Sequence, residues 1–147
     1  MIVAALTAAA GLLVATPQTE QRIEAGVSLP LDRPTIAYAN RLLSDARAAI
    51  VARKLDLKCF PYGEFEGADS CDAVRALFPL TDQRAFTPTF VGPCFGGSPD
   101  RCVAFSHRRD ADSYINVMIR LEPSGAGAAG ELVMTSIEIG EGLYTSD

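Results

Sequence analysis

The longest helical pattern in the chain begins near Pro34 and ends near Lys54. Apolar residues recur there every three or four positions, so they fall on one face of an α-helix. Asp32 or Thr35 can cap its start, and Pro34 suits the first turn. We therefore predict a long amphipathic helix over about 34–54. Its predicted buried face consists of Ile36, Ala39, Leu43, Ala46 and Ile50.

After residue 85 the period of the apolar positions changes to two, which is typical of strands with one buried face. The four alternating segments are 86–91, 101–109, 113–121 and 131–140. Pro88 has no N–H to donate to a neighbour, and this favours an edge position for the first strand. Short connections between the segments predict a four-stranded antiparallel meander over about 86–140, packed against the preceding helices.

Two weaker signals complete the organisation of the chain. Residues 18–33 are polar and mixed, which predicts a linker or a short first helix. Ser70 is a suitable N-cap for a short helix over 72–78, which Pro79 would end. Helices followed by antiparallel strands predict an α+β fold, with residues 34–147 forming a single domain.

The order of a long helix followed by a curved sheet resembles the cystatin-like and nuclear-transport-factor-2-like architectures. The resemblance covers residues 34–140 and is one of topology, since no motif in the chain carries it. Such folds carry enzymes, binding modules and inhibitors, so the resemblance implies an architecture without selecting a function.

The N-terminal segment is apolar and uncharged. No charged side chain precedes Glu20, and Ile2–Ala15 is a run of Val, Ala, Leu, Ile and Gly with few other residues. Its length fits the apolar part of a signal peptide, about 7–15 residues, and is short for a membrane-spanning helix of about 20. We predict a signal peptide over residues 1–17 and a periplasmic or secreted bacterial protein. An uncleaved membrane anchor and a buried N-terminal helix are the alternatives.

The four cysteines predict disulfides in an oxidising compartment. Their spacing does not fit zinc, which favours pairs two to four residues apart. Turn-forming residues separate Cys94 from Cys102, so a hairpin would bring the two together. We favour two local bridges, Cys59–Cys71 and Cys94–Cys102. Four buried free thiols in a cytosolic protein are the alternative.

Charge and motifs exclude several function classes. A net charge of −5 disfavours a nucleic-acid partner, which needs clustered basic residues. Residues 125–130 match the dinucleotide fingerprint in letters, but a segment of strand period follows instead of a helix. We therefore predict no cofactor. The acidic residues near 64–72 lack the spacing of a calcium loop, and we predict no metal site.

His107 is the single histidine and the weak candidate for catalysis. With Asp110 or Asp112 as an orienting carboxylate it can act as a general base, and Arg108 or Arg109 can hold an anion. The alternative is a hairpin tip whose charged groups are solvated. We favour this alternative, because no candidate nucleophile lies nearby in the sequence.

Two groups of residues are candidates for binding. Phe60, Tyr62 and Phe65 lie in the loop that the first bridge would close, where they can contact a partner or close the core. A second sheet face can line a pocket or can be a solvated surface. Its predicted pocket residues are Tyr114, Asn116, Met118 and Arg120, with Met134, Ser136 and Glu138 on the same face.

These observations favour a non-enzymatic exported domain, either a binding protein or an envelope-associated protein, whose partner is an unknown protein or small molecule. Contact with a membrane is expected only through an uncleaved N-terminal segment. The alternative is a small-molecule-binding or isomerase/hydrolase-type domain, with its pocket on the mixed sheet face and His107 as the general base.

Overall fold

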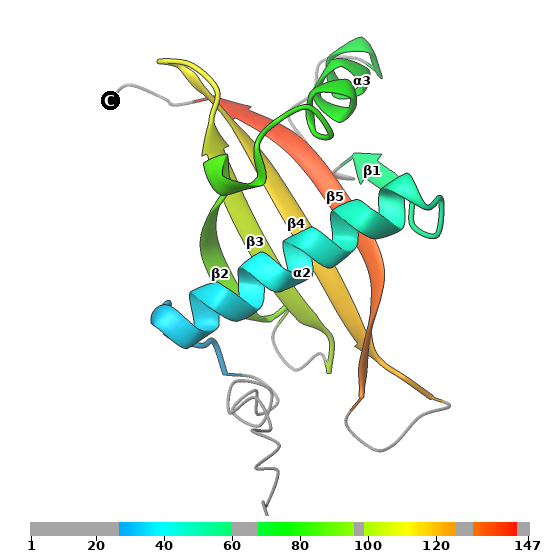
Figure 1. Cartoon of the computed structure of the whole chain (residues 1–147). Coiled ribbons are helices and arrows are strands. Elements are labelled where there is room, and N and C mark those ends of the chain that lie inside the picture. The colour runs from blue at the N-terminus through cyan, green and yellow to red at the C-terminus, as the bar shows by residue number, and fades with distance from the viewer. Residues whose placement is uncertain (1–26, 60–67, 96–98, 126–130, 144–147) are drawn as a thin grey trace, which may run out of the picture.

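The computed structural model describes residues 27–59, 68–95, 99–125 and 131–143, with the side chains of 68–71, 142 and 143 excepted (Figure 1). The fold is α+β, with one long helix and an antiparallel-rich sheet. The helical elements are α2 (Arg33–Val51), α3 (Ala68–Leu77) and the short 3₁₀ helix η1 (Gln83–Ala85). The strands are β1 (Leu57–Cys59), β2 (Thr87–Pro93), β3 (Arg101–Arg108), β4 (Ser113–Pro123) and β5 (Leu132–Leu143).

The sheet has five strands in the order β1-β5-β4-β3-β2. Strands β2 to β5 are antiparallel neighbours in chain order, and β1 lies parallel to β5 with Leu57 opposite Ile137. The four predicted antiparallel strands are therefore present as β2 to β5, but the sheet as a whole is mixed, because β1 adds a fifth strand that was not predicted. The sequence does not predict β1, because a strand of three residues is too short to show an alternating pattern. Strand β2 lies at an edge, as Pro88 predicts.

Helix α2 begins where the sequence predicts and ends earlier. Asp32 is the N-cap, and its Oδ1 accepts a hydrogen bond of 3.0 Å from the Thr35 N–H. The helix ends at Val51 rather than near 54, because Arg53 adopts a left-handed conformation with φ 56°. The N–H groups of Arg53 and Lys54 donate back to the carbonyls of Ile50 and Ala49, which forms a Schellman ending.

The region before the strands also differs from its prediction. Helix α3 begins at Ala68, so Ser70 lies within the helix instead of capping it. The helix ends at Leu77, before Pro79. Residues 27–32 are not helical, and the rest of the predicted linker lies outside the described residues.

Both helices pack on the same face of the sheet. Figure 1 shows α2 crossing the sheet obliquely, and Val74 and Phe78 join the same core from α3 and the turn after it. The buried face of α2 contains Thr35 and Tyr38 in its first turns, whereas Ile36 is 37% exposed. None of the helices in the described residues has the length and apolar character needed to cross a bilayer. The largest fully buried side chains include Phe78, Phe105, Leu43, Ile115, Ile119, Ile137 and Ile139.

The segment before α2 runs along the edge strand. The Leu29 N–H donates to the Val91 carbonyl at 2.8 Å. Gly92 permits this approach, since a Cβ at this position would lie 2.9 Å from Ser28 Cα and 2.8 Å from Phe90 Cζ. A backbone atom at that distance cannot move aside cheaply, so the absence of a side chain at Gly92 is required here.

We predict that Gly92→Ala destabilises the domain by about 1–3 kcal/mol, because the added methyl group overpacks the edge. Urea unfolding followed by circular dichroism measures the change. Gly125→Ala is the matched control, since a Cβ there meets nothing within 4 Å. The control should stay within about 0.5 kcal/mol of wild type. Equal midpoints for the two variants would contradict the close packing of Ser28 on Gly92.

Candidate functional site

The candidate binding surface is the face of the sheet opposite the helices, here named the outer face. Along β4 the residues Ser113, Ile115, Val117, Ile119 and Leu121 are buried toward the helices. The alternate residues Tyr114, Asn116, Met118 and Arg120 are partly exposed on the outer face. The structure thus places the four predicted pocket residues in one row on a central strand, away from α2 and α3.

Neighbouring strands extend this row sideways. Arg120 lies between Cys102 and Ser136, and Met118 lies between Ala104 and Glu138. The same register places Asn116 beside Ser106 and Tyr114 beside Arg108. The outer face therefore mixes polar and apolar groups across three strands.

Met134 does not belong to the outer face. A bulge in β5 changes the register after Arg120, so that Ser136 is opposite Arg120 but Met134 is opposite Leu121. Met134 consequently packs against the core. The prediction that Met134 shares a face with Ser136 is wrong. The extra residue in the bulge lies between them, so the residues on its two sides no longer follow one alternation.

Phe95 is a surface residue that sequence reasoning missed. It follows Cys94, and its side chain is 67% exposed. The Arg120 guanidinium carbon lies 5.6 Å from the centre of the Phe95 ring, which is a cation–π arrangement. The Arg120 Nε is buried and has no hydrogen-bond partner among the described residues. The available signal was a large aromatic residue in a turn-rich loop beside a cysteine.

The disulfide beside this pair matches the predicted local bridge. Cys94 and Cys102 are bonded, with their Cα atoms 4.8 Å apart. Cys102 is 2% exposed and lies beside Arg120 in the sheet. Cys59 is also disulfide-bonded, but the side chain of its predicted partner, Cys71, lies outside the described part. Phe60, Tyr62 and Phe65 lie outside it as well.

His107 lies on the helix side of β3, near the end of the sheet. It is paired with Ile115 and partly buried. Its ring is tilted against Phe86, with 5.4 Å between the ring centres, and Phe86 in turn packs edge-on against Phe78 at 5.6 Å. The imidazole therefore extends an aromatic cluster at the margin of the core, on the side of the sheet opposite the four predicted pocket residues.

Asp110 is engaged within its own turn. Its carboxylate accepts hydrogen bonds from the Asp112 N–H and from both the N–H and the hydroxyl of Ser113, at 2.7–2.9 Å. These bonds hold the pKa of the Asp110 carboxyl below its ordinary value of 3.8, with the Ser113 hydroxyl as the largest cause. The preceding residue, Arg109, pairs instead with Glu141 at 2.7 Å. Asp110 thus organises the hairpin between β3 and β4.

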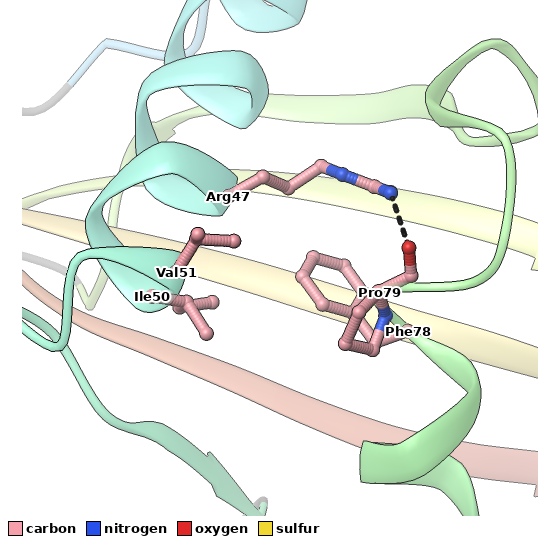
Figure 2. Close-up of a pocket in the computed structure, with 5 residues that line it drawn as sticks. All are labelled: Arg47, Ile50, Val51, Phe78 and Pro79. Carbon is pink, nitrogen blue, oxygen red and sulfur yellow. Dashed lines mark hydrogen bonds between the residues drawn. The ribbon is translucent and has the colours of Figure 1, made fainter.

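A small apolar hollow lies between the end of α2 and the turn after α3 (Figure 2). Ile50 and Val51 face Phe78 and Pro79 across it, and Arg47 reaches over the Phe78 ring to donate to the Pro79 carbonyl at 3.1 Å. Its volume of about 50 Å³ is far below the 300–1,000 Å³ typical of ligand pockets. The hollow therefore does not accommodate a small-molecule substrate.

Within the described ranges, no group of three His, Cys, Asp or Glu side chains is placed to hold a metal ion. Comparison of the chain with protein-family models, curated proteins and solved structures found no match. The site must therefore be interpreted from its own geometry.

We predict that Asp110→Asn makes the melting temperature of the domain fall less steeply as the pH is lowered below about 4. The folded-state pKa of Asp110 is lowered, so ionised Asp110 stabilises the fold above pH 4 and this contribution is lost as pH falls through the lowered pKa. The melting temperatures of wild type and variant, measured by circular dichroism from pH 7 to 2, should converge below about pH 4.

Asp112→Asn is the control for this experiment, because it removes one charge from the same hairpin. Asp82 also titrates in acid, since the hydrogen bond from the Arg84 side chain lowers its pKa to about 2. Only the difference between wild type and Asp110→Asn is therefore assigned to Asp110. A constant difference across the whole pH range would contradict the assignment.

Proposed function

We propose that this protein is an exported, non-enzymatic binding domain that uses the outer face as its contact surface. The observation that carries the proposal is the partly exposed row on β4, with neither α2 nor α3 on that side. Tyr, Met and Arg are enriched at protein interfaces, and the row contains all three in Tyr114, Met118 and Arg120. A sheet face is also a rigid platform, so little conformational entropy is lost on binding.

Export is supported by the cysteines and by the N-terminal pattern. The Cys94–Cys102 disulfide and the absence of free cysteines in the described part are typical of a periplasmic or secreted protein. The apolar residues 1–17 are proposed to be the signal peptide that directs the chain there.

The alternative function is small-molecule binding or isomerase/hydrolase chemistry with His107 as the base. That chemistry needs a cavity at the imidazole and a carboxylate that orients it. Instead, His107 packs on Phe86, and Asp110 bonds within its own turn. The described hollow is lined by other residues. The geometry therefore favours binding over catalysis.

The export proposal predicts that all four cysteines resist a thiol reagent in protein isolated from its host. Cells are quenched in acid, the denatured protein is treated with a maleimide, and its intact mass is measured with and without prior reduction. The expected mass increase is zero without reduction and four labels after it, because all four cysteines are expected in bridges. Labels added without reduction would indicate a reducing compartment, and an unshortened mass would contradict removal of residues 1–17.

The binding proposal predicts that cross-links form at the outer face and not on the exposed side of α2. A photoreactive phenylalanine analogue replaces Met118 in one variant and the exposed Ser44 in the control. Irradiation of host cells should give an adduct of one defined mass only from position 118. Excess wild-type domain should suppress this adduct in extracts, whereas excess Met118→Glu domain should not. Equal adducts at the two positions, or none at 118, would contradict the proposal.

A further inference from the structure

We propose that Phe95 and Arg120 anchor the partner, and that the partner is a polypeptide segment presenting a carboxylate beside an aromatic or large apolar side chain. This inference rests on the binding function proposed above and specifies the chemistry of the occupant.

Phe95 is exposed and at the same time constrained. The residue before it is held by the Cys94–Cys102 disulfide and by a hydrogen bond of 3.2 Å from the Cys94 N–H to the Asp100 carbonyl. The Arg120 guanidinium lies against one side of its ring. An exposed aromatic side chain that is already ordered loses little entropy on binding, which is a property of interface anchors.

Arg120 has a charge that no ion pair among the described residues neutralises. The described ion pairs involve Arg75, Arg84 and Arg109, and Arg120 is absent from them although Glu122 and Glu138 share its face. Among the described residues its Nε is buried without a hydrogen-bond partner, as are Arg47 Nη1 and Arg101 Nε, and of the three arginines Arg120 is the one on the outer face. A guanidinium stacked on an aromatic ring keeps its N–H edges available for a carboxylate.

The surrounding charges restrict the class of anion. Glu122 and Glu138 on the same face repel a densely charged ligand such as a nucleic acid or a polyphosphate. A single carboxylate avoids most of this repulsion. It also makes the paired hydrogen bonds that a guanidinium favours.

The shape of the surface favours a polypeptide over a small acid. The row from Tyr114 to Arg120 spans about 20 Å at roughly 3.4 Å per residue, and it is an open face of the sheet. A small molecule there would leave most of its surface in water, whereas ligand pockets enclose most of theirs. An extended segment of about six residues can contact the whole row.

The test titrates isotope-labelled domain with the capped peptide Tyr-Gln-Phe-Glu-Tyr and with its counterpart in which Gln replaces the single Glu. The acidic peptide should bind about tenfold more tightly or better, because the bond to Arg120 is charge-assisted. Its resonance changes should centre on the Phe95 ring and on the Arg120 Nε–H signal. Arg120→Gln and Phe95→Ser should each remove the preference for Glu, and Arg120→Lys should not restore it.

Arg41→Gln is the matched control, since it removes one positive charge from the exposed side of α2. Equal binding of the two peptides, or equal losses in Arg41→Gln and Arg120→Gln, would overturn the inference. Sedimentation velocity tests whether the domain associates with itself. If wild type self-associates and Arg120→Gln does not, the occupant of the outer face is a second copy of the chain, and this result would also overturn the inference. Cross-links at Met118 without a preference for Glu would overturn this inference alone and leave the proposed function standing.

Discussion

The structure depends on burial of one face of β4 beneath α2. Ile115, Val117 and Ile119 are at most 1% exposed on the central strand of the sheet. Burying each such side chain contributes roughly 1.5–3 kcal/mol. Because side chains alternate along a strand, this burial forces the residues between them, Tyr114, Asn116, Met118 and Arg120, onto the opposite face. The outer face is thus a geometric consequence of the core, and the helices determine which side is left open.

The features of the fold that could be predicted are those encoded by a repeated local pattern. The helical stripe located α2, and alternation located four strands to within a few residues. The features that could not be predicted depend on single residues or on distant partners. Arg53 ends α2 by a left-handed backbone that arginine seldom adopts, and β1 exists because β5 offers an edge to a three-residue segment. Neither leaves a periodic signal in the sequence.

The same distinction applies to the candidate site. Turn-forming residues between Cys94 and Cys102 made their bridge predictable from local sequence, and alternation placed Met118 and Arg120 on one face. The contact of Phe95 with Arg120 joins residues from separate strands and loops, so it required the register of β3 against β4. The displacement of Met134 required knowledge of the bulge in β5. Local patterns therefore identified the surface, and only tertiary structure identified its most distinctive pair.

We propose that the residue at position 120 serves binding rather than folding. An apolar side chain there would pack on Phe95 and cover Cys102 without leaving a polar atom buried and unpartnered. Arginine introduces such an atom at Nε and places its charge on an exposed aromatic ring. Functional sites commonly contain residues that are not optimal for stability. The disulfide at Cys102 stabilises the fold by about 2–3 kcal/mol in the chain-entropy model, and Cys102 lies beside Arg120 in the sheet. The covalent bridge and the proposed anchor residue therefore lie at the same corner of the outer face.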